Sequence, residues 1–241
     1  MINKESRILV TGASRGLGKS LVEILVKKSL NITVVARGFY DLKLKKKITF
    51  IKCNILKKDD FSNLKKKLKK KNFDFVIHCI GGGLGIKSVL SKKKLWEKSL
   101  FFNAIHAIEL NNILVPNMIK NKIKGKLIHV SSYSSIDGGP DFKKFGNAAP
   151  YTCSKAFLNM YVKTASNELK HKNINFVAVL PGPIMLEHKH WFKLKKENPE
   201  LVKKFQRDYM KNAKFLTANQ VGKFIFKVCK KNLKVNKLTI K

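Results

Sequence analysis

A glycine-rich loop near the start of the chain constrains the fold more than any other feature. The apolar run at residues 7–10 leads into TGASRGLG at residues 11–18, and a segment of helical period follows at once. Glycines between a strand and a helix allow a tight turn, let a pyrophosphate approach backbone N–H groups and let the helix pack closely on the strand. The positive end of the helix dipole favours that negative charge. The loop therefore predicts a dinucleotide site that uses Gly12, Ser14, Arg15, Gly16, Leu17 and Gly18.

Short apolar runs alternate with longer segments of helical period along the rest of the chain. We expect strands at residues 32–36, 48–52, 73–80, 126–130, 174–180 and 237–240, and helices at residues 17–28, 59–71, 100–119, 151–171 and 217–230. This alternation predicts an α/β fold, a doubly wound, Rossmann-like parallel sheet, in a single domain over residues 1–241. Residues 186–211 are polar, aromatic and irregular, so we expect a mobile, helical flap over a substrate.

Composition argues against several other classes of protein. The sequence has no uninterrupted apolar run of the ~18 residues that a membrane span requires, and its first seven residues leave no room for a cleavable leader. We therefore expect a cytoplasmic protein with no membrane partner. The four cysteines show neither a C-x-x-C pair nor the spacing of a zinc site. His188 and His190, beside Glu187, have no matching ligand cluster elsewhere, so no metal is expected.

The strong positive charge has two interpretations. A formal net charge of +36 is typical of proteins that bind nucleic acid. Only four of the 51 basic residues are arginine, however, although nucleic-acid readers use arginine for bidentate contacts. The lysines are spread over almost every predicted helix and accompany many Asn and Ile residues, as an AT-rich coding bias would produce. We therefore expect no specific nucleic-acid partner, and keep a nucleic-acid-binding protein as a rival hypothesis.

A tyrosine and a lysine four residues apart supply a candidate for acid–base chemistry. Tyr151 and Lys155 share one face of a predicted helix that begins just after Pro150. A lysine ammonium beside a phenol, together with the positive end of the helix dipole, stabilises the phenolate and suits the tyrosine to general acid–base catalysis. The pair is a weak signal alone in a lysine-rich chain. It gains weight from its order, because it follows a strand that ends at Ser131 and Ser132.

Taken together, these motifs resemble the short-chain dehydrogenase/reductase family. The resemblance runs from about Arg7 through Ile184 and combines the TGxxxGxG loop, an Asn in the fourth helix, the Ser pair, YxxxK and the PGPI turn. It implies that Tyr151 is the proton donor or acceptor and that Lys155 binds the nicotinamide ribose and lowers the pKa of the tyrosine. It also implies that Ser132, with Ser131 as the second candidate, binds the substrate oxygen and that Asn103 helps hold a water beside Lys155. Further cofactor contacts implied by the family pattern are Asn54, Gly81, Pro181, Gly182 and Ile184.

Several departures from the family pattern concern the same region. The family's NNAG is here HCIG at residues 78–81, so only Gly81 is kept. Residues 133–150, between Ser132 and Tyr151, form a longer stretch than the family normally has, and we expect it to include a loop over the active site. The threonine that commonly follows the PGxI turn is missing, with Met185 and Leu186 in its place. These departures favour a rival hypothesis, a non-catalytic NADP(H)-binding sensor on the same fold.

The end of the second predicted strand indicates which nicotinamide cofactor is used. Enzymes selective for NAD place an acidic residue about 20 residues after the glycine loop, where it binds the ribose 2′-hydroxyl. Arg37 stands there instead, and Arg15 lies inside the loop. Because a guanidinium suits a phosphate, we expect NADP(H) as the cofactor. The resemblance further implies a small-molecule carbonyl or alcohol substrate, with Trp191, Phe192 and Phe205 in contact with it, and a homodimer or homotetramer.

Overall fold

A parallel sheet forms the centre of the computed structural model, which describes residues 2–29, 31–39, 41–136, 148–187, 189–231 and 236–240. Within these residues seven strands follow the order β3-β2-β1-β4-β5-β6-β7, and every neighbouring pair is parallel. The order reverses beside β1, as in doubly wound folds. The strands are β1 (Arg7–Thr11), β2 (Asn31–Ala36), β3 (Thr49–Lys52), β4 (Phe75–His78), β5 (Lys126–Val130), β6 (Asn175–Pro181) and β7 (Lys237–Ile240).

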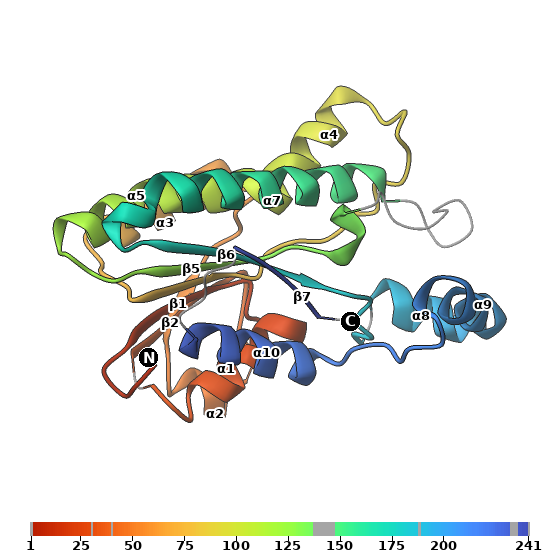
Figure 1. Cartoon of the computed structure of the whole chain (residues 1–241), viewed down its shortest axis with the longest axis horizontal. Helices are drawn as coiled ribbons and strands as arrows, with labels where there is room; N and C mark the ends of the chain where they lie inside the picture. Colours follow the sequence, from red (N-terminus) through yellow and green to blue (C-terminus); the bar gives the residue numbers. More distant parts are fainter. Residues whose placement is uncertain are drawn as a thin grey trace.

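Helices cover both faces of this sheet, as Figure 1 shows. One face carries α1 (Gly16–Leu25), α2 (Leu42–Lys45) and α10 (Ala218–Lys230), and the other carries α3 (Lys58–Leu68), α5 (His106–Lys120) and α7 (Ala149–Leu169). Three more helices, α4 (Lys93–Leu100), α8 (His190–Glu197) and α9 (Pro199–Met210), lie beyond the ends of the sheet. None of the helices in the described ranges is long and apolar enough to cross a membrane.

The alternation of side chains along β1 divides the core into two layers. Ile8 and Val10 join the cluster under α1 and α10, whereas Leu9 joins the cluster under α3, α5 and α7, and all three are fully buried. A central parallel strand is covered on both faces, so its residues form a continuous apolar run. Each such side chain contributes roughly 1.5–3 kcal/mol of burial free energy. The predicted α/β fold with a doubly wound, Rossmann-like parallel sheet is confirmed.

The structure corrects the prediction between residues 73 and 120. The expected strand at residues 73–80 is shorter, because β4 ends at His78 and the chain then turns toward the glycines that follow. The single helix expected at residues 100–119 is instead α4, a π-helical turn (Phe101–Ile105) and α5. The single wide π-helical turn has no 3.6-residue apolar period of its own, so the sequence pattern did not show it.

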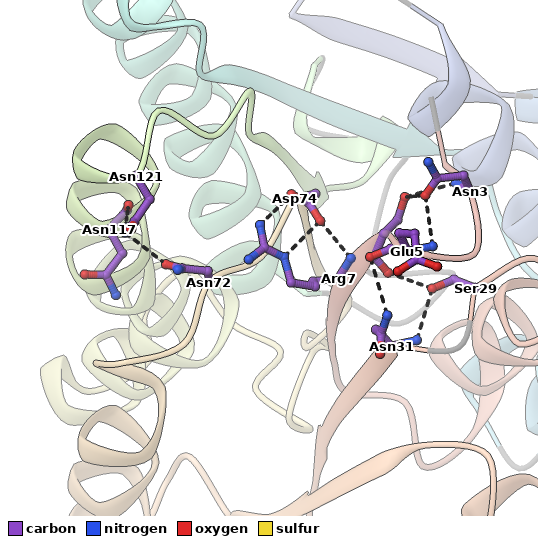
Figure 2. A network of polar contacts seen from close by, with 10 residues as sticks. Asn3, Glu5, Arg7, Ser29, Asn31, Asn72, Asp74, Asn117 and Asn121 are labelled. Carbon is purple, nitrogen blue, oxygen red and sulfur yellow. Dashed lines mark hydrogen bonds and ion pairs between the residues drawn. The ribbon is translucent and has the colours of Figure 1, made fainter.

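A polar network ties the amino ends of β1 and β4 together, on the side of the sheet where these strands begin (Figure 2). The Asp74 carboxylate accepts hydrogen bonds from the Arg7 backbone N–H at 2.8 Å, from Nε at 3.2 Å and from Nη2 at 2.9 Å. Burial raises the pKa of Asp74, but the side-chain and backbone hydrogen bonds from Arg7 outweigh it, and the pKa is lowered overall. The ionised carboxylate therefore stabilises the fold.

Replacing Asp74 with alanine should lower the free energy of unfolding by about 1–2 kcal/mol, because one acceptor holds three donors. The difference from wild type should shrink as the pH falls below the ordinary Asp range, since wild type then loses the same ionised group. Urea denaturation at neutral pH and at acidic pH measures both effects. Glu97→Ala is the control, because Glu97 forms an exposed pair with Lys93 at 3.7 Å and should change stability by less than about 0.5 kcal/mol. A loss for Asp74→Ala no larger than that of the control would contradict this assignment.

Candidate active site

Close backbone contacts in the loop between β1 and α1 require its glycines. Gly12 has φ of +77°, and a Cβ there would lie 2.9 Å from the backbone nitrogen of Ile80. A Cβ on Gly18 would collide with the carbonyl oxygen of Gly12. Any larger residue at these positions must therefore push α1 away from the ends of β1 and β4.

The N-terminus of α1 is suited to an anion. Arg15 precedes the helix, no side chain caps its first N–H groups, and no acidic residue stands in its first turn. Unpaired N–H groups at a helix start, combined with the helix dipole, bind phosphate. Gly16 adopts φ of +56° at this point. The residues present therefore fit the pyrophosphate of a dinucleotide.

Tyr151, at the start of α7, lies beside Ser132, which follows β5. The hydroxyl of Ser132 hydrogen-bonds the Tyr151 side chain and also lies 2.9 Å from the Ser134 hydroxyl. Burial raises the pKa of Tyr151, and the hydrogen bond from Ser132 only partly offsets this effect. The structure thus brings together the serine and the tyrosine that the sequence singled out. The intervening residues 137–147, where an insertion was expected, lie outside the described residues.

Lys155, one helical turn after Tyr151, is almost completely buried. Its Nζ donates to the backbone carbonyl of Val130 at 2.7 Å and to that of Asn103 at 3.3 Å. Burial lowers the pKa of Lys155 to about 7. The pKa of Tyr151 is raised by burial and only partly lowered by Ser132, and Lys155 is not among the groups that shift it, so the role of Lys155 in lowering the pKa of the tyrosine stays a prediction. A Cβ on Gly81 would lie 2.9 Å from Nζ, so the glycine leaves the space that the lysine occupies.

The π-helical turn positions Asn103 for two separate tasks. Its side-chain oxygen accepts from the Gly82 N–H at 2.8 Å, and its amide nitrogen donates to the Ser99 carbonyl at 2.9 Å. Its backbone carbonyl meanwhile faces Lys155. The wide turn frees that carbonyl from the regular helical ladder. Asn103 therefore connects the strand-end loop after β4 to the buried lysine.

The remaining predicted cofactor residues lie in several parts of the fold. Arg15 and Arg37 are both exposed, Arg37 directly after β2, and neither takes part in the ion pairs found between described residues. At the end of β6, the Gly182 N–H donates to the Ile240 carbonyl at 2.8 Å. Ile184 forms an isolated β-bridge with Leu216. Pro181 is the last residue of β6, while Ser14 and Leu17 remain in the loop and first turn. The Asn54 side chain accepts from the Leu56 N–H at 3.2 Å, and its cofactor contact stays a prediction.

The flap expected at residues 186–211 consists of α8 and α9, but one of its aromatic residues differs from the prediction. Phe205 is 3% exposed and packs against Trp191, with ring centroids 4.1 Å apart. Phe215 also packs on Trp191 at 5.3 Å. Phe205 therefore stabilises the two helices internally and does not present its ring to a substrate.

Sequence patterns did not reveal a buried polar cluster behind Lys155. His78 on β4 and His129 on β5 stand opposite one another in register, with ring centroids 4.9 Å apart. Asn111 of α5 joins them: its oxygen lies 2.9 Å from His78 Nε2, and its nitrogen lies 2.9 Å from His129 Nε2 and 3.1 Å from the Tyr161 hydroxyl. These partners fit a His78 that donates from Nε2 and a His129 that accepts there. His78 occupies the first position of the family's NNAG, so the substitution was the available signal.

Burial keeps the histidines of this cluster neutral. It lowers the pKa of His78 to about 4 and that of His106, whose ring lies 6.4 Å from His78, to about 3. Burial likewise lowers the pKa of His129. An unfolded histidine has a pKa of about 6.5, so the unfolded chain binds more protons between that pH and about 4. The cluster therefore stabilises the fold at neutral pH and loses that contribution as the pH falls through this window.

The variant His78→Gln should reduce this pH dependence, because an amide can still donate to Asn111 but does not titrate. Between pH 7.5 and pH 5, wild type should lose about 1–2 kcal/mol more unfolding free energy than the variant, from the shift of one histidine. Urea denaturation at the two pH values measures the difference. His171→Gln, at an exposed position, is the control and should follow wild type. Parallel pH curves for wild type and His78→Gln would show that His78 is not held neutral.

Comparisons with known proteins agree with this geometry. A family model described as short chain dehydrogenase matches residues 6–195. The L-xylulose reductase of Caenorhabditis elegans is 28% identical over 190 residues, which cover 76% of this chain and 73% of the relative. The 3-oxoacyl-[acyl-carrier-protein] reductase FabG of Rickettsia prowazekii is 29% identical over 179 residues, 72% of this chain and 70% of the relative.

The fold is also shared with solved structures. The crystal structure of L-sorbose reductase from Gluconobacter frateurii, complexed with NADPH and L-sorbose, matches with a TM-score of 0.81 and 20% identity, over 100% of this chain and 97% of that chain. Since the family model spans most of the sequence, from the strand before the glycine loop into α8, the chain belongs to the short-chain dehydrogenase family of oxidoreductases.

Proposed function

We propose that this protein is an NADPH-dependent oxidoreductase that interconverts a carbonyl and an alcohol on a small substrate, with Tyr151 as the general acid or base. One observation carries the proposal. The Tyr151 phenol is hydrogen-bonded to Ser132 and stands one helical turn before a buried Lys155. A neutral phenol aligned by a serine is ready to give its proton to a carbonyl oxygen.

The residues around the glycine loop and Lys155 would hold the cofactor. The N-terminus of α1 and the loop residues would bind the pyrophosphate. Lys155 would bind the hydroxyl groups of the nicotinamide ribose. Pro181, Gly182 and Ile184, where β6 ends, would border the nicotinamide, and Arg15 and Arg37 would bind the 2′-phosphate. Bound NADPH would supply the hydride.

Acid–base chemistry at the substrate oxygen would be the contribution of the protein. In the reductive direction Tyr151 donates its proton to the oxygen that becomes the alcohol, and Ser132 donates a hydrogen bond to the same oxygen. A phenolate then remains. The ammonium of Lys155, which the carbonyl groups of Val130 and Asn103 hold in place, would stabilise it.

Substrate and assembly are proposed at the level of class. The relatives reduce a sugar or a 3-oxoacyl group, judging by their names, so a free or nucleotide-linked sugar, a 3-oxoacyl thioester or a small ketone is the substrate class to screen. The α8–α9 flap would close over it. We also propose a single-domain, cytoplasmic protein that forms a homodimer or homotetramer through α5 and α7, where Phe157 and Met160 of α7 are 45% and 59% exposed.

Tyr151→Phe should abolish most turnover while cofactor binding stays nearly intact, because it removes the transferable proton and little else. We expect kcat to fall by ~10²- to 10⁴-fold on a substrate found by the screen. NADPH binding by calorimetry and thermal unfolding are measured on the same variant to show that the site is intact. Loss of less than about tenfold in kcat would contradict the role of Tyr151. Wild-type protein that binds NADPH but turns over no candidate would favour the sensor hypothesis.

Arg37→Asp should erase or reverse the preference for NADPH, since a carboxylate repels the 2′-phosphate and accepts the 2′-hydroxyl of NADH. For wild type we expect kcat/KM to favour NADPH by roughly 100-fold, from two charge-assisted contacts partly screened by solvent. Lys28→Asp makes the same charge change at an exposed site and should keep the preference. Equal use of both cofactors by wild type would refute the role of both arginines without touching that of Tyr151.

A further inference from the structure

The segment that follows β6 is fixed over the glycine loop. Ile184 forms a bridge with Leu216, and the Met185 N–H donates to the Leu216 carbonyl at 2.9 Å. Leu216 in turn donates to the Pro183 carbonyl at 2.9 Å. The next residue, Leu186, places its two methyl groups 3.5 and 3.8 Å from the position that a Cβ on Gly16 would occupy. The root of the flap therefore contacts the loop that would hold the cofactor phosphates.

A turn just after this contact, at the segment that packs on Gly16 beside Arg15, places the exposed Lys189 within electrostatic reach of Arg15 and Arg37. The Lys189 N–H donates to the Leu186 carbonyl at 3.1 Å, and α8 begins at the next residue. Burial, and then the charges of Arg15 and Arg37, lower the pKa of Lys189. The three side chains come from three separate segments: the loop before α1, the end of β2 and the flap.

These three charges lack a carboxylate partner in the described part of the chain. The ion pairs found there use other lysines and Arg7 or Arg207. Positive charges that lie near one another repel, which costs free energy. A site that keeps such charges is suited to binding an anion. Coding bias explains lysines dispersed on helix surfaces, but it does not explain why one from the flap lies within electrostatic reach of two of the chain's four arginines.

We infer that Lys189 is a third ligand for the cofactor 2′-phosphate and joins the flap to the site formed by Arg15 and Arg37. The inference rests on the proposed use of NADPH and adds a residue from the flap to it. A phosphate between the three cations relieves their repulsion and holds the start of α8 on the glycine loop. NADPH then positions the flap better than NADH does. Lys189 thus contributes to cofactor selectivity from the substrate side of the protein.

Calorimetric titration with two small probes tests this role without turnover. Adenosine 2′,5′-bisphosphate carries the 2′-phosphate, and adenosine 5′-monophosphate lacks it. Wild type, Lys189→Gln, Lys189→Arg, Arg37→Gln and Lys195→Gln are compared at physiological salt. Lys195→Gln is the matched control, because Lys195 is an exposed lysine of the same helix, outside the three-cation cluster.

We expect Lys189→Gln to weaken adenosine 2′,5′-bisphosphate by about 5- to 30-fold, the effect of one charge-assisted contact reduced by solvent screening. Binding of adenosine 5′-monophosphate should change by less than about twofold, Lys189→Arg should restore most of the loss, and Lys195→Gln should match wild type. Equal weakening of the binding of both probes would overturn the inference, because the lysine would then act on the 5′-phosphate or only through the overall positive charge of the protein. Normal bisphosphate binding by Lys189→Gln, with a loss in Arg37→Gln, would overturn it while the proposed cofactor stands. Wild type that does not distinguish the probes would overturn both.

Discussion

The buried ammonium of Lys155 is the group on which the arrangement of the site depends. A charged lysine removed from water is costly unless oxygen atoms replace its hydration. Here the carbonyl of Val130 at the end of β5 and the carbonyl of Asn103 in the π-helical turn do so. Gly81 gives it room. One side chain thus holds together β5, the turn before α5, the loop after β4 and the first turns of α7, where Tyr151 lies.

Close backbone contacts at the glycines and a buried hydrogen-bond network keep these elements in place. Glycines do so at the loop, where Gly12 and Gly18 allow α1 to approach β1 and β4 without side chains between them. Hydrogen bonds do so behind the lysine, where Asn111 joins His78, His129 and Tyr161 across β4, β5, α5 and α7. His78 stands where the family pattern has the first Asn of NNAG, and burial keeps its imidazole neutral. A buried polar network of this kind connects the elements around it, and it is sensitive to acid because its histidines are held neutral.

The sequence predicted what depends on local pattern and missed what depends on contacts between distant segments. The short apolar runs predicted the strands, and the helix expected at residues 217–230 is α10, which Thr217 caps with Gln220 completing a capping box. The π-helical turn around Asn103 has no periodicity of its own. The raised pKa of Tyr151 follows from burial, which the spacing between Tyr151 and Lys155 does not reveal. Lys189 was one lysine among many until the turn after Leu186 placed it beside the arginines.

The most direct test of the account is NADPH oxidation by wild type and by Lys155→Met over a panel of sugars, ketones and 3-oxoacyl thioesters, with cofactor binding measured in parallel. The account predicts that wild type turns over at least one class and that Lys155→Met loses both rate and NADPH affinity, since one ammonium serves the ribose and the phenolate. Lys163→Met, at an exposed position of the same helix, should behave as wild type. Full activity and full affinity in Lys155→Met would contradict the central role of this lysine.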